Sequence, residues 1–402
     1  MVLTRVQRKP RPLAARSISS FAKARFSQLG LCPLAFQKDV WQAMEEKACG
    51  LIHAPTGFGK TYAVWAGVLG HLHRAGGSGS GSGSGSSSAA NAGLQVLWIT
   101  PMRALAADTF QALGRFAPEG FSLGLRTGDT SSHERAKQDR RPPQGLVTTP
   151  ESLSLMLSKP QSLAGLKALR FVVVDEWHEL IGNKRGSLLE LSLAALASLT
   201  GKTLQVWGLS ATLGNLDEAA QVLCHSLGSP VRISASGRQP PRIKTLLPKD
   251  PIRFAWSGHL GLTMLEPVLA QIEKVGSSLL FTNTRSQAEL WYQAILQARP
   301  DWAGQMALHH GSLDSDTRAW VEKATAAGEL RVVVATSSLD LGVDFTPVEQ
   351  VFQVGSPKGV ARLLQRAGRS GHQPKGVSSL YMVPTHGFEI LESLAAQQAI
   401  DE

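Results

Sequence analysis

The sequence predicts an α/β protein made of two tandem domains, each a parallel sheet flanked by helices. Its 402 residues are more than a single hydrophobic core usually serves, so the length alone favours two domains. Short, β-rich apolar runs alternate with longer helical patterns along the chain, which is typical of βαβ units. Hydrophobic residues make up 43% of the chain and charged residues 18%, a balance that indicates a folded globular protein.

The expected strands form two groups, separated by a stretch rich in proline and basic residues. In the first half they span residues 50–53, 94–99, 145–148, 170–174 and 205–209. In the second half they span residues 277–281, 306–309, 331–335 and 350–354. We expect the stretch at 229–251 to connect the halves, with a boundary near residue 234. The predicted parts are a basic N-terminal arm (1–29), a first domain (30–233) and a second domain (234–402).

Residues 76–93 form a low-complexity segment rich in Gly and Ser. It follows a helical pattern at 61–74 and precedes the strand at 94–99, so we predict a flexible loop inserted within the first domain. A natural insertion and an engineered replacement both fit its composition.

The net charge of +10 comes mainly from the N-terminal end of the chain. Residues 1–38 hold eight of the 41 Lys and Arg residues and none of the 31 Asp and Glu residues. Such an arm either adds affinity for phosphate groups or is a solvated tail, and both interpretations stay open. Its Arg- and Ser-rich composition also fits an organellar transit peptide.

The sequence lacks the features of membrane-spanning, secreted and metal-stabilised proteins. No stretch approaches the roughly 20 apolar residues that a membrane-spanning helix needs, and the N-terminus lacks the apolar core of a secretory signal. Cys32, Cys49 and Cys224 form no CxxC pair, so we expect three reduced, buried thiols without a disulfide or metal site. We therefore expect a soluble intracellular protein.

The segment APTGFGKT at residues 54–61 lies between an expected strand and an expected helix. In this context glycines let backbone N–H groups surround phosphates, and the Lys and Thr that follow reach the phosphates and Mg²⁺. Ala54 stands where the general pattern has its first glycine. The residues predicted to bind the nucleotide and its metal here are Thr56, Gly57, Gly59, Lys60 and Thr61.

A second motif, FVVVDEWH at residues 171–178, is an apolar run that ends in two adjacent carboxylates. A carboxylate at the carboxyl end of a buried parallel strand lies at the ligand crevice, so Asp175 is predicted to hold Mg²⁺. Glu176 is predicted to orient and deprotonate the attacking water. The alternative is a solvated acidic turn, which the preceding phosphate loop disfavours. Together the two motifs predict ATP and Mg²⁺ as cofactors and ATP hydrolysis as the reaction.

With Ser210-Ala-Thr212 after these two motifs, the chain resembles the DExH-box helicases of superfamily 2. The other matching segments are TPMRAL (100–105), TGD (127–129), TTPES (148–152), FTNTR (281–285), HHGS (309–312), ATSSLDLGVD (335–344) and QRAGRSGH (365–372). The match covers roughly residues 30–385. The resemblance implies two RecA-like domains, with the ATP site in the cleft between them, and a helicase that hydrolyses ATP.

A finer resemblance is to the Lhr-type helicases, especially the bacterial branch named for its association with a DNA ligase. It rests on DEWHEL (175–180), WGLSATLGN (207–215), GHLG (258–261) and RSQAELWYQ (285–293). This resemblance implies 3′-to-5′ movement on single-stranded DNA or a 3′-tailed duplex and a role in DNA repair. It also implies a DNA ligase or nuclease of the same pathway as a partner.

Two alternatives to a DNA helicase stay open. An RNA-remodelling helicase fits equally, because the sequence does not expose contacts to a 2′-hydroxyl. An ATP-gated nucleic-acid clamp is the other alternative. The family's members continue into a winged helix and further modules that contact the duplex, so we expect a chain that ends at residue 402 to unwind weakly.

The resemblance carries several roles over to single residues of the second half. Arg369 corresponds to the arginine finger that reaches the γ-phosphate, and Arg366 and Gln365 are expected to assist it. His372 stands where the family has its final arginine, so a second finger is not expected there.

The remaining predicted site residues bind the base, the ribose or the nucleic-acid strand. Gln37 is predicted to read adenine through its amide, although a polar residue on a helix face fits as well. Asp344 is predicted to lie near the ribose, with a turn aspartate as the alternative. The residues expected to bind strand phosphates are Arg103, Thr149, Thr284, Arg285 and Thr336. Those expected to couple nucleotide state to strand grip are His178, Ser210 and Thr212. Most of the nine tryptophans are expected in the core.

Overall fold

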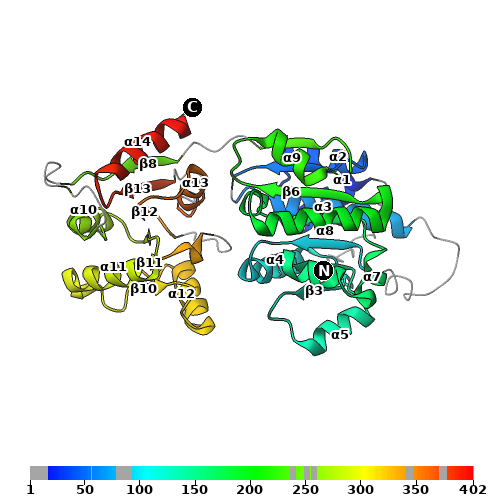
Figure 1. Ribbon diagram of the computed structural model, residues 1–402, viewed down its shortest axis with the longest axis horizontal. Coiled ribbons are helices and arrows are strands. Elements are labelled where there is room, and N and C mark those ends of the chain that lie inside the picture. The colour runs from blue at the N-terminus through cyan, green and yellow to red at the C-terminus, as the bar shows by residue number, and fades with distance from the viewer. Residues whose placement is uncertain are drawn as a thin grey trace, which may run out of the picture. The chain divides into compact units, whose positions relative to one another are not determined.

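The computed structural model describes residues 17–55, 57–77, 93–225, 227–235, 241–248, 254, 260–340, 347–370 and 378–401. The chain divides into two compact units, and the main break follows Ala235. Each unit contains a sheet flanked by helices (Figure 1). Two predicted nucleotide-binding residues, Thr56 and Asp344, lie outside the described residues, as do residues 1–16 and most of the Gly/Ser-rich segment.

The first unit is built on a seven-stranded sheet in which every strand pair is parallel. The strand order is β3-β4-β2-β5-β6-β1-β7. The strands are β1 Gly50–His53, β2 Val96–Ile99, β3 Leu123–Arg126, β4 Gly145–Thr148, β5 Phe171–Val174, β6 Gln205–Ser210 and β7 Val231–Ser234. Strands β4, β2, β5 and β6 are buried along their whole length, as expected of a parallel sheet covered on both faces.

Helices cover both faces of this sheet. Four helices, α1 to α4, pack against alternating strand residues such as Trp98, Phe171 and Val173. On the opposite face α9 lies so close to β6 that a Cβ on Gly208 would be 2.5 Å from Leu223. The helices are α1 Ile18–Gln28, α2 Ala35–Glu45, α3 Lys60–Gly77, α4 Arg103–Phe116, α5 Ser132–Arg140, α6 Pro150–Leu157, α7 Pro160–Leu166, α8 Lys184–Thr200 and α9 Leu216–Cys224, with short 3-10 helices η2 Trp177–Glu179 and η3 Gly201–Thr203.

The second unit contains a six-stranded sheet of order β10-β11-β9-β12-β13-β8, again with every pair parallel. In β9, Leu279 and Phe281 pack with α12, α13 and α14, whereas Leu280 packs with α10 and α11. The strands are β8 Arg242–Thr245, β9 Ser278–Phe281, β10 Met306–His309, β11 Val332–Ala335, β12 Gln350–Val354 and β13 Ser379–Val383. The helices are α10 Leu265–Ile272, α11 Arg285–Ala298, α12 Ser315–Ala327, α13 Val360–Ala367 and α14 Gly387–Asp401, with short 3-10 helices η5 Leu262–Met264, η6 Pro300–Trp302 and η7 Ser337–Leu339.

Two parallel sheets flanked by helices confirm the predicted α/β class. All nine predicted strands are present, with bounds within two residues of the expected ones. Among the described tryptophans Trp41, Trp65, Trp98, Trp177, Trp207 and Trp291 are fully buried, whereas Trp320 is exposed. Within the described parts of the chain, every helix is too short or too polar to cross a bilayer.

Four strands were not predicted from the sequence, and three of them, β3, β7 and β8, are edge strands. Edge strands are only partly covered, so β7 and β8 alternate intermediate and exposed residues instead of forming the continuous apolar run of a buried strand. The stretch at 229–251 is therefore not only a connection, because it contains β7 of the first sheet and β8 of the second. The fourth missed strand, β13, pairs with β8.

The cysteines differ from the expectation at one position. Cys49 and Cys224 are buried, as predicted, but Cys32 is exposed, because it lies in the connection between α1 and α2. The N–H of Val206 donates to Sγ of Cys49 at 3.4 Å, and Sγ of Cys224 donates weakly to the carbonyl of Val206 at 4.0 Å. The expectation of three buried thiols is thus wrong for Cys32.

A thiol reagent should therefore react rapidly with Cys32 alone in the folded protein. We expect one fast-reacting thiol in the native chain, none in Cys32→Ser, and all three thiols of the wild-type chain after denaturation. Spectroscopic counting of thiols with a chromogenic disulfide checks this. A second fast thiol in native Cys32→Ser would contradict the burial of Cys49 and Cys224.

Candidate nucleotide and nucleic-acid sites

The nucleotide motifs follow three strands that are neighbours in the first sheet, β5, β6 and β1. The phosphate loop follows β1, Asp175 and Glu176 follow β5, and Ser210 ends β6. Parallel strands end at the same edge of a sheet, so the fold brings together motifs that are far apart in the sequence. This edge of the first unit is the candidate nucleotide site.

The phosphate loop has the local geometry that its glycines predict. Gly57 and Gly59 have φ values of +82° and +76°, a left-handed conformation that is costly for residues with a Cβ. Lys60 begins α3 and Thr61 is its second residue. Both therefore lie at a helix N-terminus, where unpaired backbone N–H groups and the helix dipole favour a bound phosphate. Lys60 is largely buried there, with 7% of its surface exposed.

Gln37, in α2, packs against this loop and is almost fully buried. Its Nε2 donates to the carbonyl of Gly59 at 3.1 Å, and its Oε1 accepts the N–H of Leu34 at 2.9 Å. These two bonds tie the start of α2 to the phosphate loop. A glutamine amide has a second N–H donor and a second acceptor lone pair, so Gln37 could contact adenine while keeping both of these bonds. Its contact with adenine stays a prediction.

Asp175 is buried at the end of β5, where it accepts two hydrogen bonds. Its Oδ2 accepts the indole N–H of Trp98 at 3.3 Å, and its Oδ1 accepts the N–H of Glu176 at 3.0 Å. Burial, followed by the adjacent charge of Glu176, raises the pKa of the Asp175 carboxyl to about 7, and Lys60 acts in the opposite direction. A divalent cation would favour the charged form of this carboxyl.

The donor set at this edge fits Mg²⁺. Among the described residues, no cluster of three or more His, Cys, Asp or Glu side chains could hold a metal ion by itself. Mg²⁺ at nucleotide sites is typically bound by one or two protein oxygens, with phosphates and water as the other ligands. Two oxygen donors of this kind are present. One is the buried Asp175 carboxylate, whose two hydrogen bonds come from uncharged N–H groups, and the other is the Thr61 hydroxyl at the start of α3.

Glu176 has a backbone conformation that residues other than glycine rarely adopt. Its φ of 46° and ψ of 50° are left-handed, and such strain is concentrated at functional sites. Its Oε2 is buried and makes no hydrogen bond. Nδ1 of His178 is 3.6 Å away from this oxygen. A buried carboxylate oxygen with unused acceptor capacity is suited to take a proton from water.

Two of the three predicted coupling residues are in contact. Nδ1 of His178 lies 3.1 Å from Oγ of Ser210, which joins the hydrolytic motif to the end of β6. Burial lowers the pKa of His178, although Glu176 and Glu179 raise it, so the imidazole is neutral at neutral pH. The third residue, Thr212, has a buried Oγ1 that makes no hydrogen bond.

The predicted strand-binding residues of the first unit follow β2 and β4, on the other side of β5 from β6 and β1. Arg103 is the first residue of α4, and its Nη1 binds Oδ1 of Asp129 at 2.7 Å. Thr149 precedes α6, and its Oγ1 donates to Oγ of Ser152 at 3.3 Å. Both residues therefore lie at helix N-termini, where phosphate oxygens are bound favourably.

The second unit repeats this pattern on β9 and β11, which are neighbours in its sheet. Thr284 caps α11 by accepting the N–H of Gln287 at 3.2 Å. Arg285 is the first residue of α11, and its Nε binds Oε1 of Glu289 at 2.7 Å. Thr336 follows β11 and immediately precedes η7. All five predicted strand-binding residues thus lie where a helix begins after a parallel strand.

The predicted arginine-finger segment lies in and after α13, which follows β12. Gln365, Arg366 and Arg369 are all at least 97% buried. Arg366 is fixed within the second unit, because its Nε and Nη2 bind the Asp340 carboxylate at 2.7 and 3.0 Å. Its Nη1 also donates to Oε1 of Gln353. The structure therefore gives Arg366 a structural role, and its assistance in catalysis stays a prediction.

The acidic partners of two predicted strand-binding arginines were not singled out from the sequence. Asp129 pairs with Arg103 across 26 residues of sequence, and no local pattern signals such a pair. Glu289 pairs with Arg285 four residues earlier on the same helix, a spacing that could have predicted it.

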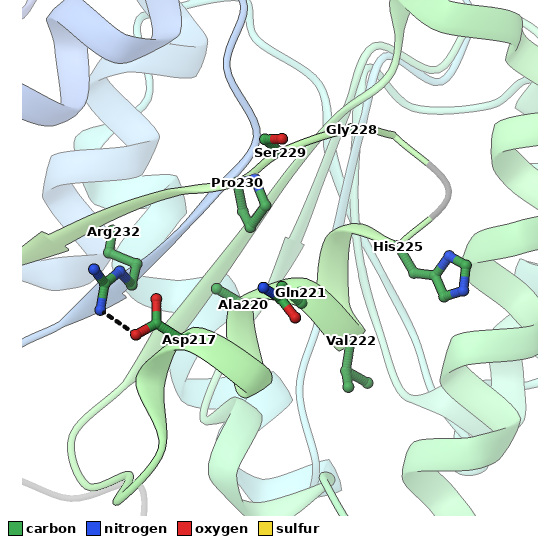
Figure 2. Close-up of a pocket in the computed structure, with 9 residues that line it drawn as sticks. All are labelled: Asp217, Ala220, Gln221, Val222, His225, Gly228, Ser229, Pro230 and Arg232. Atoms are coloured by element: carbon green, nitrogen blue, oxygen red, sulfur yellow. Dashed lines mark hydrogen bonds and ion pairs between the residues drawn. The ribbon is translucent and has the colours of Figure 1, made fainter.

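A hollow of about 570 Å³ lies elsewhere on the first unit, between α9 and the start of β7 (Figure 2). Asp217, Gln221 and His225 line it from the α9 side, and Pro230 and Arg232 line it from the β7 side. Asp217 and Arg232 form an ion pair of 2.9 Å beside it. None of the predicted nucleotide or strand residues lines this hollow.

Comparisons with known proteins show similarity to helicases over most of the chain. The model of the DEAD/DEAH box helicase family matches residues 34–219, and that of the helicase conserved C-terminal domain matches residues 262–373. The ATP-dependent helicase Lhr-Core of Sulfolobus acidocaldarius is 34% identical over 366 residues, which is 87% of this chain and 41% of that protein. The Lhr helicase/uracil glycosylase of Escherichia coli is 33% identical, over 90% of this chain and 27% of its own length.

A solved structure shows the same similarity in three dimensions. Mycobacterium smegmatis helicase Lhr, bound to ssDNA and AMP-PNP, matches with a TM-score of 0.78 and 31% identity. The match covers 95% of this chain and 49% of that one.

The tandem parallel sheets, with the DExH motif at a strand end, define a helicase of superfamily 2 with two RecA-like domains. Within that superfamily the chain belongs to the Lhr-type helicases. It spans less than half the length of these relatives. The predicted family is therefore confirmed.

Replacing Arg366 should destabilise the second unit. Arg366→Met would remove both hydrogen bonds that Arg366 makes to the buried Asp340 carboxylate and would leave only Arg362, whose Nε lies 3.6 Å from Oδ2. Breaking a buried ion pair in this way costs about 3–5 kcal/mol. We expect a correspondingly lower free energy of unfolding of this unit in a chemical denaturation series. The double variant Asp340→Asn/Arg366→Met should lose less, because it leaves no buried charge. Unchanged unfolding of Arg366→Met would contradict the structural role.

Proposed function

We propose that this chain is an ATP-driven motor that moves 3′ to 5′ along single-stranded DNA and acts in DNA repair. The observation that carries the proposal is the division of the first sheet. The nucleotide motifs follow β5, β6 and β1, whereas the candidate strand-binding residues follow the adjoining β2 and β4. One edge of one sheet therefore holds residues suited to hydrolyse a nucleotide and residues suited to bind a phosphate backbone.

In the proposed reaction Lys60 binds the β- and γ-phosphates at the start of α3. Glu176 orients the attacking water and accepts its proton through the carboxylate oxygen that has no hydrogen bond. Mg²⁺, held by Asp175 and Thr61, would neutralise charge on the phosphates. Arg369 is proposed to serve as the arginine finger, a group worth on the order of 10³–10⁵ in rate.

Hydrolysis is proposed to alternate which unit grips the strand. Thr149 and Arg103 in the first unit, and Thr284, Arg285 and Thr336 in the second, bind phosphate oxygens and do not read bases. His178 and Ser210 connect the hydrolytic carboxylate to the end of β6. Movement then follows from the difference in grip between nucleotide states.

DNA is the proposed substrate because the solved Mycobacterium smegmatis relative is bound to ssDNA. The candidate contacts are to phosphates, which DNA and RNA share, so they do not favour either. The proposed setting is a bacterial cytoplasm, and the proposed partner is a DNA ligase or nuclease of the same repair pathway. This setting rests on the sequence resemblance to the ligase-associated branch.

We expect single-stranded DNA to stimulate ATP hydrolysis, since a motor couples turnover to its track. Turnover should be measured with no strand, with single-stranded DNA and with single-stranded RNA of the same sequence. In Glu176→Gln turnover should fall by about 10²–10⁴ under every condition, because the general base is lost. Nucleotide binding by this variant should persist.

Glu134→Gln is the matched control, because Glu134 is an acid of the same unit that pairs with Lys137 on α5 and that the mechanism does not use. Displacement of streptavidin from a 3′ or a 5′ biotin separately reports the direction of movement. Full activity of Glu176→Gln would reject the hydrolytic assignment. Equal turnover of the wild-type chain with and without strand would reject the motor.

A further inference from the structure

We propose that Arg185 and Glu151 are positioning residues that transmit the state of the hydrolytic motif to the strand-binding start of α6. Arg185 is the second residue of α8, and Glu151 is the second residue of α6. The inference rests on the proposed function, because it takes Thr149 at the start of α6 as a strand contact.

The first link joins the DExH segment to the start of α8. Asn183 caps α8, and its Oδ1 accepts the N–H groups of Arg185 and Gly186 at 2.9 and 3.1 Å. The same side chain donates through Nδ2 to the carbonyl of Glu179 at 2.7 Å. One asparagine thus fixes the first turn of α8 to η2, which directly follows Glu176.

This first link is also sterically tight. A Cβ on Gly186 would lie 2.0 Å from the carbonyl oxygen of Leu180, so the backbone of α8 directly contacts the turn that follows η2. Trp177, the first residue of η2, is fixed to α9, because its indole N–H donates to the carbonyl of Ala219 at 3.0 Å. A displacement of Glu176 and η2 would therefore also displace the start of α8, because close packing leaves little room for them to move separately.

The second link joins α8 to α6 through a two-point ion pair. Nε of Arg185 is 2.5 Å from Oε1 of Glu151, and Nη2 is 3.2 Å from Oε2. This fork geometry fixes the orientation of both side chains. Arg185 lowers the pKa of the Glu151 carboxyl, so the pair is charged at neutral pH.

The third link is electrostatic and acts where the strand is expected to bind. A carboxylate in the first turn of α6 competes with a phosphate for the positive end of the helix and repels it. Arg185 neutralises that carboxylate, and the neighbouring Thr149 side chain also lowers the pKa of Glu151. The position of Arg185, set by the hydrolytic motif, therefore decides how favourably a phosphate meets the start of α6.

An isolated surface ion pair of similar exposure offers a matched control. Arg232 and Asp217 are joined by one bond of 2.9 Å, beside the hollow between α9 and β7 (Figure 2). Their side chains are 50% and 67% exposed, compared with 40% and 49% for Arg185 and Glu151. Single exposed pairs of this kind contribute little, so Arg232→Gln should change neither readout described below.

The first test needs no strand. Hydrogen exchange of the backbone amides at residues 152–156 should differ between the ADP and AMP-PNP complexes of the wild-type protein. In Arg185→Gln this difference should disappear, while Arg232→Gln keeps it. A wild-type protein without the difference, or an Arg185→Gln protein that retains it, would overturn the proposal.

The second test measures stimulation of ATP turnover by single-stranded DNA as the ratio of rates with and without strand. We expect this ratio to fall about tenfold in Arg185→Gln, within the usual range of coupling between sites. The exchanged pair Glu151→Arg/Arg185→Glu should recover most of it, because the ion pair is restored. Failure of the exchanged pair to recover, in a protein with wild-type thermal stability, would count against the proposal.

The two tests separate this inference from the proposed function. A wild-type chain that no strand stimulates would reject the motor, and the exchange measurement would still decide whether the pair transmits nucleotide state. Strand stimulation that survives in Arg185→Gln would reject the pair and leave the motor in place.

Discussion

The all-parallel pairing of both sheets is the constraint on which the rest of the structure depends. Parallel strands require helical crossovers, and these cover both faces, so the central strands are buried and apolar. Polar side chains are thereby confined to the strand ends, and all carboxyl ends meet at one edge of each sheet. In the first unit that edge contains the phosphate loop, the two carboxylates and the start of α6.

The boundary between the nucleotide half and the strand half of the first sheet lies between β5 and β2, and Trp98 crosses it. Its indole N–H, from β2, donates to Asp175 at the end of β5. Its ring also packs edge-on against Trp65 of α3, the helix that follows the phosphate loop. The two halves are therefore joined by buried contacts as well as by strand pairing. Such close packing transmits displacement, as the proposed coupling between the nucleotide site and the strand-binding residues requires.

Much of this arrangement could be predicted from the sequence because it depends on local patterns. Continuous apolar runs identified β2, β4, β5 and β6, and the Gly57-Phe-Gly59 segment identified a loop with left-handed glycines. Strands β3, β7 and β8 could not be identified, because half-covered edge strands lack a continuous apolar run. The partners of Arg103, Arg185 and Arg366 were equally inaccessible, since each pair depends on tertiary packing between distant segments. Gln37 was recognised by its place in the sequence, but its bond to Gly59 was not.

In the proposed motor, nucleotide and strand are bound at one sheet edge and are therefore thermodynamically linked. The most direct measurement is the affinity for a fluorescent single-stranded DNA in the presence of AMP-PNP, of ADP and of no nucleotide. We expect affinities for DNA that differ between nucleotide states by about 5- to 150-fold, with a reciprocal change in nucleotide affinity when DNA is bound. Equal DNA affinities in all three states would contradict the proposed motor, because binding sites without coupling cannot drive movement.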